Sequence, residues 1–194
     1  MFKAIENLLQ ELYIYIYSMM KIVITGKPGI GKTTLIKKLS EYLKKKGIKT
    51  KGFYTEEIRE FGERIGFKIR SLDGKEGILA HKSFNTTKRV GKYGVNIEIL
   101  EKTIGEYLPP STDVIYIIDE IGKMELFSPL FKDFIKTIVE GDYFFITTAA
   151  ISKIPFVDWV KNNPRIQLFQ LTKSNREKLL TIIINKIEKL RIFK

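Results

Sequence analysis

Short apolar runs and helical spacings follow one another along the chain, which predicts an alternation of strands and helices. The run "IVIT" at 22–25 predicts a buried strand, and the Leu and Ile residues that follow at intervals of three and four predict a helix. The expected strands lie at 22–25, 114–119, 143–148 and 165–171, and the expected helices at 32–46, 97–107, 128–140, near Trp159 and at 174–190. This order predicts an α/β fold with a mostly parallel central sheet, helices on both faces, and ligands beyond the carboxyl ends of the strands.

Residues 48–79 break this order with two segments that alternate between apolar and polar positions. The segments 48–58 and 64–72 are predicted to be strands, and Asp73 and Gly74 supply a hairpin turn. We therefore expect a small antiparallel insert. The next stretch, 82–94, is polar, basic and glycine-containing with little periodicity, which predicts a mobile loop.

The first twenty residues differ in character from the rest of the chain. Glu6 and Glu11 interrupt the apolar residues and no small-residue cleavage site is present after them, so neither a secretion signal nor a membrane span is expected. We expect one domain over 21–194, preceded by a loosely attached extension over 1–20. The alternating "YIYIY" leaves open that the extension adds a strand or a self-association surface.

Net charge and composition limit the classes of binding partner and of chemical site that this chain can have. The chain has 34 basic and 22 acidic residues, a net charge of +12, which favours an anionic partner: a nucleotide, a nucleic acid or a membrane surface. With no cysteine and one histidine, thiol nucleophiles, zinc-thiolate sites and histidine clusters are excluded. We expect a cytoplasmic monomer without a membrane partner, and the Lys- and Glu-rich, cysteine-free composition is that of a heat-adapted protein.

The segment "GKPGIGKTT" carries the clearest chemical signal. It matches the pattern G-x-x-x-x-G-K-[ST] and lies between a predicted strand and a predicted helix, as a phosphate-binding loop requires. Successive N–H groups and the positive end of the helix would surround an anion. Lys32 would reach the β- and γ-phosphates, and the Thr33 hydroxyl would bind Mg²⁺. The predicted loop comprises Gly26, Lys27, Pro28, Gly29, Ile30, Gly31, Lys32, Thr33 and Thr34.

Two acids end the predicted central strand "VIYIID". Asp119 lies at its carboxyl end, where it would hold the magnesium shell. Glu120 follows at once and could orient and deprotonate a water for attack on the γ-phosphate. The alternative is that Glu120 is a solvent-facing loop residue. A kinase would use its acceptor's own hydroxyl, so the pair favours hydrolysis.

Three arginines are candidates for closing over the phosphates. Arg59 and Arg64 lie in the expected insert, and Arg89 lies in the expected loop. An arginine that stabilises the transition state contributes about 10³ to 10⁵ in rate. Each of the three is equally well explained as a solvated surface residue.

Several motifs together resemble a known family. The segments "GKPGIGKTT", "GFYTEEIREFGERIGF", "RVGKYGVN", "IIDEIGKMELFS" and "LTKSNREKLL", in this order, resemble the small nucleoside-triphosphatase family that includes the cancer-related nucleoside-triphosphatase and thermophile relatives. The resemblance runs from about Lys21 to the end of the chain. It implies a RecA-like P-loop fold and Mg²⁺-dependent hydrolysis of several nucleoside triphosphates, ATP and GTP among them, without strict choice of base.

The resemblance also implies further nucleotide-binding residues. Asn175 and Arg176 match the family's "NR" before the final helix, either beside the base or as a helix cap. A second nucleotide-binding segment is implied at Ile115, Tyr116, Ile117, Ile118, Asp119, Glu120, Ile121 and Gly122.

Two other functions remain open on the sequence. The net charge of +12 leaves room for an RNA- or DNA-binding protein switched by nucleotide, although no nucleic-acid motif accompanies the charge. A nucleotide-dependent kinase is the other alternative. A GTPase is disfavoured, because "NKIE" at 185–188, the near match to the guanine-reading motif, lies inside the predicted last helix.

Overall fold

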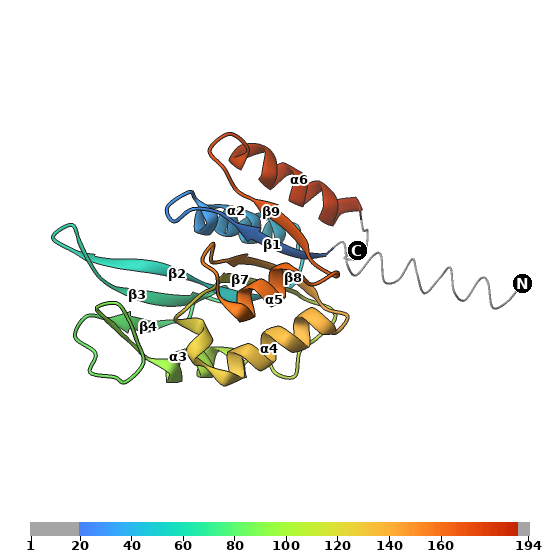
Figure 1. Cartoon of the computed structure of the whole chain (residues 1–194). Coiled ribbons are helices and arrows are strands. Elements are labelled where there is room, and N and C mark those ends of the chain that lie inside the picture. The colour runs from blue at the N-terminus through green and yellow to red at the C-terminus, as the bar shows by residue number, and fades with distance from the viewer. Residues whose placement is uncertain (1–19, 190–194) are drawn as a thin grey trace, which may run out of the picture.

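A nine-stranded mixed sheet forms the middle layer of the computed structural model, which describes residues 20–189 (Figure 1). The strand order is β5-β6-β4-β3-β2-β7-β8-β1-β9. The strands are β1 (Lys21–Thr25), β2 (Thr50–Glu60), β3 (Glu63–Ser71), β4 (Glu76–His81), β5 (Arg89–Val90), β6 (Tyr93–Val95), β7 (Ile115–Ile121), β8 (Phe144–Ala149) and β9 (Gln167–Gln170). The helices are α2 (Lys32–Lys45), α3 (Ile97–Gly105), α4 (Pro129–Glu140), α5 (Pro155–Lys161) and α6 (Arg176–Lys189), with the short 3-10 helix η1 (Glu125–Phe127).

The central strands of the parallel half, β1, β7 and β8, are buried on both faces of the sheet. Strands β2, β7, β8, β1 and β9 pair in parallel, so all five run toward the same edge, where β7, β8, β1 and β9 end. In β7 the side chains alternate between two cores: Ile115 and Ile117 pack on one face, and Tyr116 and Ile118 on the other. Burial on both faces is typical of a central parallel strand.

Helices cover both faces of the sheet, as the alternating pattern predicted. Figure 1 shows α2 and α6 on one side and α3, α4 and α5 on the other. The apolar stripe of α2, which consists of Leu35, Ile36, Leu39 and Leu43, is buried. Side-chain caps fix the starts of two helices on the opposite face, because Asn96 accepts the Ile99 N–H of α3 and Ser128 accepts the Phe131 N–H of α4. The predicted α/β architecture is therefore confirmed.

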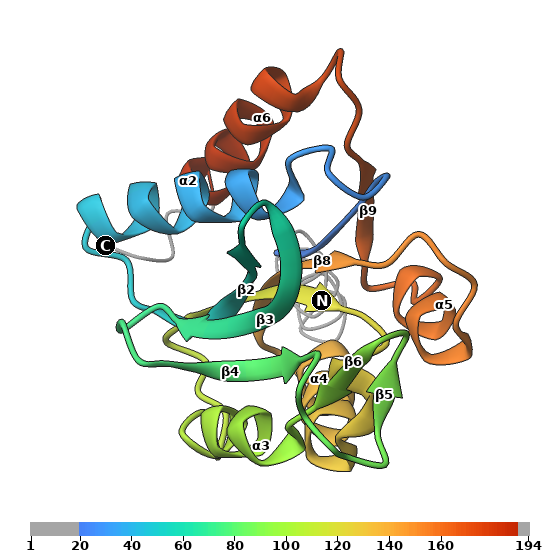
Figure 2. The same cartoon turned by 90° about the vertical axis from the view of Figure 1, so that its left-hand side faces the viewer.

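The predicted antiparallel insert is present and continues the main sheet. Strand β2 pairs in parallel with β7 through Thr50–Tyr54 and antiparallel with β3 through Phe53–Glu60. The β2–β3 hairpin therefore extends beyond the edge at which the parallel strands end (Figures 1 and 2). Its tip carries Phe61, a fully exposed side chain with φ of 48°.

The prediction of an irregular loop over 82–94 is wrong in its second half. Arg89–Val90 and Tyr93–Val95 form the short antiparallel strands β5 and β6, and β6 also pairs with β4. Gly91, at φ 56°, allows the tight turn between them. The Tyr93 ring packs edge-on against Phe67 at 5.3 Å, so a contact distant in sequence orders a segment without periodicity of its own.

The ends of the chain meet the predictions in part. The last helix begins at Arg176, two residues later than predicted, and residues 1–19 and 190–194 lie outside the described part of the chain. Residues 1–19 of the expected extension, with the "YIYIY" alternatives, therefore fall outside the described residues. Met20 is already buried in the core on the α2 side. Across residues 20–189, no helix combines the length and the apolar character needed to cross a bilayer.

Lys21 lies fully buried at the start of β1, at the edge opposite the phosphate-loop motif. Its Nζ donates to Val139 O at 2.7 Å and to Gly141 O, carbonyls at the end of α4 that lack partners within the helix. Burial is the main cause that lowers the pKa of Lys21 to about 8, and a neutral amine still has two N–H groups for these two acceptors. Lys21 therefore joins the end of α4 to the central sheet.

We predict that Lys21→Met lowers the free energy of unfolding by about 1–3 kcal/mol, because the substitution removes the side-chain donor of the buried Val139 carbonyl, whereas Gly141 O still accepts from Arg165. Urea denaturation measures the change. Lys136→Met, on the exposed face of α4, is the matched control and is expected to change stability by less than about 0.5 kcal/mol. Equal stabilities of the two variants would contradict the role given to Lys21.

Candidate functional site

The loop between β1 and α2 lies at the carboxyl edge of the parallel strands (Figure 2). Gly29 and Gly31 have φ values of 73° and 107°, which non-glycine residues rarely adopt. Gly26 is buried against the end of β9, where an added Cβ would lie 2.8 Å from Leu171 O. The glycines of the motif therefore allow the backbone conformation of the loop and its close approach to Leu171.

The first turn of α2 is open to an anion. Gly31 occupies the N-cap position without a side-chain cap, and no acidic residue lies in the first turn. The N–H groups there are not claimed by a capping side chain, and the helix end is positive. Lys27, Pro28 and Thr34 are exposed around this turn.

Lys32 reaches across the loop that it follows. Its side chain is 11% exposed, and Nζ donates to Gly26 O at 3.2 Å. The same Nζ lies 3.5 Å from Oε2 of Glu120. The structure thus brings together the lysine and the acid that the sequence separated by 88 positions.

Asp119 is buried at the end of β7 and held by two hydroxyls. Thr33 donates to Oδ2 and Thr148, from the neighbouring β8, donates to Oδ1. Burial raises the pKa of the Asp119 carboxyl, and these two hydrogen bonds and Lys32 act against that rise. Sequence reasoning found Thr33 and Asp119 but missed Thr148, whose signal was a pair of threonines ending the apolar run of the next strand.

The oxygens at this point fit a magnesium ion. A threonine hydroxyl and a carboxylate in contact are hard oxygen donors, and Mg²⁺ is usually bound by one or two such groups together with waters and substrate phosphates. Within residues 20–189, no group of three or more His, Cys, Asp or Glu side chains could hold a metal. Thr33 and Asp119 are therefore the residues that would hold Mg²⁺, completed by a ligand.

Glu120 lies within β7 and is not part of a free loop. Its side chain is 34% exposed, and burial raises the pKa of its carboxyl while Lys32 opposes the rise. The peptide bond between Asp119 and Glu120 is cis. The partly open position beside Lys32 disfavours the alternative of a solvated loop glutamate.

A third acid, Glu125, was missed by the sequence reasoning. It lies in η1, is 4% exposed, and burial raises the pKa of its carboxyl to about 8, with Glu120 and Asp119 adding to the rise. An added Cβ on Gly122 would lie 3.0 Å from an oxygen of Glu120 and 3.0 Å from an oxygen of Glu125. The only signal in the sequence is an acid within the apolar stretch "MELF".

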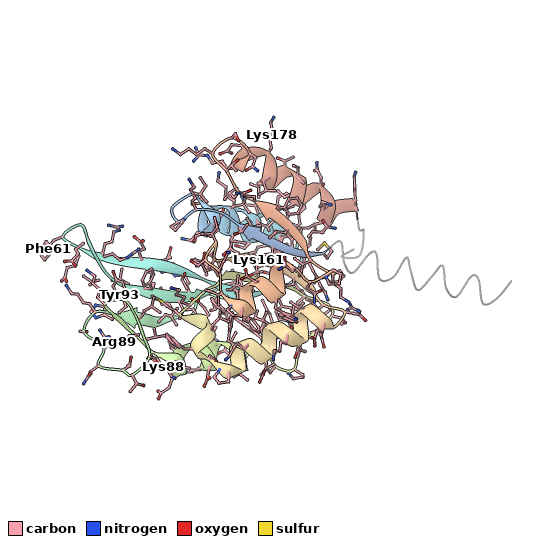
Figure 3. All side chains as sticks on the ribbon, viewed as in Figure 1. Phe61, Lys88, Arg89, Tyr93, Lys161 and Lys178 are labelled. Atoms are coloured by element: carbon pink, nitrogen blue, oxygen red, sulfur yellow. The ribbon has the colours of Figure 1, made fainter. Side chains whose placement is uncertain are left out.

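The three candidate arginines bond to residues of the insert and of the segment that follows it, where Figure 3 shows Arg89 and Tyr93. Arg59 pairs with Glu57 at 2.6 Å and donates to Gly62 O. Arg64 pairs with the same Glu57 at 2.8 Å and donates to the hydroxyl of Tyr93. Arg89 donates to the carbonyls of Phe84 and Lys92. These hydrogen bonds of the arginines are thus to the insert and to residues 84–93, and not to the phosphate loop.

Only some residues of the two segments implied by the family resemblance lie at the site. Asp119, Glu120 and Gly122 lie at the carboxyl edge of β7, whereas Ile115–Ile118 and Ile121 are buried in the cores. Asn175 closes the turn before α6, accepting from Thr172 N and donating to Gln170 O, both at 2.8 Å. The Arg176 side chain is 60% exposed, with Nε 3.8 Å from Glu177.

A row of lysines follows the strands at this edge. Strands β7, β8, β1 and β9 are neighbours in that order, and each is followed within four residues by an exposed lysine. These are Lys123, Lys153, Lys27 and Lys173. The segments 26–31, 150–154 and 171–175 contain no acid, so the positive charge there is not balanced locally. Such an edge attracts anions.

A family model described as NTPase matches residues 21–184. Nucleoside-triphosphatase THEP1 of Thermotoga maritima is 49% identical over 170 residues, which cover 86% of this chain and 94% of the relative. The cancer-related nucleoside-triphosphatase of Homo sapiens is 36% identical over 185 residues, covering 88% and 97%.

Two solved structures share the fold. The crystal structure of THEP1 from the hyperthermophile Aquifex aeolicus superposes with a TM-score of 0.77 at 39% identity, covering 86% of this chain and 98% of that one. The solution structure of the human cancer-related nucleoside triphosphatase gives a TM-score of 0.75 at 35% identity, covering 87% and 97%. The resemblance and the P-loop fold inferred from the motifs are confirmed, and the chain belongs to the NTPase family.

Proposed function

We propose that this chain is a Mg²⁺-dependent nucleoside triphosphatase that hydrolyses ATP, GTP, CTP and UTP to the diphosphate and phosphate without strict choice of base. The observation that carries the proposal is the contact of Lys32 with Glu120 beside the contact of Thr33 with Asp119, at the mouth of a glycine-rich loop. Membership of the NTPase family and the names of the relatives support the same activity.

Different residues of the chain bind the phosphates, hold the metal ion and act on the water. The N–H groups at the start of α2 and the Lys32 ammonium bind the phosphates, and Thr33 and Asp119 hold the cofactor. When bound, Mg²⁺ would offset the charge of the β- and γ-phosphate oxygens. Since Lys32 would turn to the phosphates, its contact with Glu120 would loosen and leave that carboxylate available to water.

Hydrolysis itself requires one proton acceptor. The water oxygen forms a bond to the γ-phosphorus as the bond to the bridging oxygen breaks, and Glu120 takes the proton that the water loses. Its raised pKa brings the carboxyl nearer to the pH at which a general base works best. Arg59, Arg64 or Arg89 would supply transition-state charge only after leaving its present partners, so we propose slow basal turnover.

Broad base choice, monomeric state and cytoplasmic location are the finer parts of the proposal. The near match to a guanine-reading motif lies within α6, where Asn185 is exposed on the helix surface, which supports recognition through the phosphates. Helices of the same chain cover both faces of the sheet, which supports a monomer. The cysteine-free composition fits the cytoplasm.

A second candidate function is binding of RNA or DNA under control of the nucleotide. The observation in its favour is the row of lysines across the ends of four neighbouring strands. Affinity for single strands that falls steeply with salt would support it, and stimulation of hydrolysis by RNA would join the two functions. Labelled phosphate found on a small acceptor, and not as free phosphate, would point to a kinase instead.

We predict that Glu120→Gln lowers kcat for phosphate release by about 10²- to 10⁴-fold, because the amide cannot accept the proton of the water. Nucleotide binding, measured by calorimetry, is expected to persist or tighten, since the competing contact with Lys32 loses its charge. Lys32→Ala is the companion variant and is expected to lose binding. Full activity of Glu120→Gln would refute the role of Glu120.

We predict that chelation of Mg²⁺ abolishes hydrolysis and that Thr33→Val raises the Mg²⁺ concentration needed for half-maximal rate by about tenfold or more, because a hydroxyl ligand is lost. Titration of phosphate release against Mg²⁺ measures both. Thr137→Val, whose hydroxyl bonds Asp133 O on the surface of α4, is the control and is expected to behave as wild type. Identical Mg²⁺ curves for the two variants would contradict the assignment.

We predict that the triple variant Lys123→Gln, Lys153→Gln and Lys173→Gln raises KM for ATP by about threefold or more at low salt, and that high salt removes the difference. The control replaces Lys44, Lys45 and Lys136, exposed lysines outside this edge, and removes the same charge. An equal rise in KM in both triple variants would contradict the prediction, because the total charge and not the position of the lysines would then set KM.

A further inference from the structure

Residues 77–97 carry positive charge that the proposed hydrolysis uses only in part. This stretch contains no acidic residue, and its four basic residues are all exposed: Lys82, Lys88, Arg89 and Lys92. Lys92 forms a salt bridge with Glu63, whereas the salt bridges among residues 20–189 include none of the other three. Exposed positive charge without a nearby counter-ion favours an anionic ligand.

A cavity of about 490 Å³ opens beside these basic residues. Hydroxyl and amide groups contribute to its lining, from Ser83, Asn85, Thr86 and Thr87. Lys88 is the basic residue of the lining and Phe84 is the aromatic one, while Glu98 supplies a carboxylate. The volume is within the range of small-molecule sites, so the cavity has room for one base and its sugar.

Hydrogen bonds within the segment hold the wall of the cavity in place. Arg89 donates across the loop to Phe84 O at 2.9 Å and to Lys92 O at 2.8 Å. Thr86 donates through its hydroxyl to Lys88 O, also at 2.9 Å. A surface that is ordered before binding loses less conformational entropy when a ligand arrives.

The segment borders the carboxyl edge of the sheet. Nζ of Lys88 lies 5.9 Å from the centroid of the Phe127 ring, which belongs to η1. Helix η1 begins two residues after Lys123, a member of the row of lysines at that edge. Figure 3 shows Lys88 and Arg89 at the periphery of the molecule. The positive charge of the segment therefore continues the charge of the lysine row.

The groups around the cavity fit a single strand of nucleic acid better than a membrane surface. None of the exposed large apolar side chains, which would enter a lipid layer, lies within 82–92. The Phe84 ring is half-buried and lies 5.7 Å from the His81 ring. Unpaired bases stack on such rings and bond to amides and hydroxyls, while their phosphates contact lysines. Paired bases of a duplex have no access to a cavity of this kind.

We propose that residues 82–92 bind single-stranded nucleic acid. One unstacked base and its sugar enter the cavity against Phe84, and the flanking phosphates contact Lys82 and Lys88. This surface is separate from the phosphate loop, so the inference goes beyond the proposed hydrolysis and does not depend on it. It gives the second candidate function a defined place on the molecule.

The test measures binding of short oligo(U) RNA and oligo(dT) DNA to the full-length chain by fluorescence anisotropy at several salt concentrations. The double variant Lys82→Gln, Lys88→Gln is expected to bind about tenfold more weakly at low salt. The slope of log K against log salt is expected to fall by about 1.4, since each lost phosphate contact removes about 0.7. Binding of either strand supports the proposal, and tighter binding of RNA would add a contact to the 2′-hydroxyl.

Two double variants remove the same charge elsewhere. Lys44→Gln with Lys45→Gln acts at the end of α2, and Lys153→Gln with Lys173→Gln acts on the lysine row. Both controls are expected to change affinity less than the variant of Lys82 and Lys88 does. A loss as large in either control would overturn the proposed location, because total charge or the lysine row would then account for binding.

Phe84→Leu acts on the cavity and leaves the charge unchanged. It is expected to weaken binding by about fivefold or more with the salt slope of wild type, because a stacking contact is lost and no phosphate contact is. A loss of folding would not imitate this result, since phosphate release from ATP is measured on the same preparation and is expected to match wild type. Unchanged affinity of Phe84→Leu would overturn the placement of a base in the cavity.

The remaining outcomes separate this inference from the proposed hydrolysis. Absence of salt-dependent binding to both oligonucleotides overturns the inference and leaves the hydrolysis intact. Binding to vesicles of anionic phospholipid without binding to oligonucleotides overturns it as well, in favour of a membrane. Failure of the hydrolysis would instead appear as absent phosphate release while oligonucleotide binding is retained.

Discussion

The parallel pairing of β7, β8 and β1 is the constraint on which the site depends. Because β8 lies between the other two strands, the end of β1, where the glycine loop starts, and the end of β7, where the acids lie, face one edge across a single strand. Asp119, on β7, accepts one hydroxyl hydrogen bond from α2 and one from β8, and so joins three elements. Both oxygens of this buried carboxyl find a hydroxyl donor in that arrangement, so the site and the register of the sheet support each other.

Sequence alone predicted most of the parallel half and the chemical core of the site. The apolar runs and helical spacings located β1, β7, β8 and the helices, because burial on both faces leaves a strong local pattern. The glycine loop and the acids at 119 and 120 were also recognisable locally, because their chemistry needs residues that are contiguous in the sequence.

What the sequence could not predict depends on contacts between distant segments. Strands β5 and β6 are ordered by pairing with β4 and by the packing of Tyr93 on Phe67, neither of which leaves a local pattern. Thr148 became a partner of Asp119 only through the register of β8, and Glu125 became a neighbour of Glu120 only through the fold of η1 around Gly122. Arg59 and Arg64 lie in the insert as expected, and Arg89 lies in the following segment, on β5. Their partners, which include Glu57, Tyr93 and main-chain carbonyls, could not be foreseen.

Strand β2 has a mechanical consequence. It is hydrogen-bonded to β7 over one half and to β3 over the other, with Phe53 and Tyr54 shared between the two ladders. The root of the hairpin is therefore anchored beside Asp119, with which Tyr54 pairs, and the β2–β3 ladder farther out has an irregularity at Ile58 and Arg59. A force applied at the tip, Phe61, would reach β7 and Asp119 through the backbone of β2.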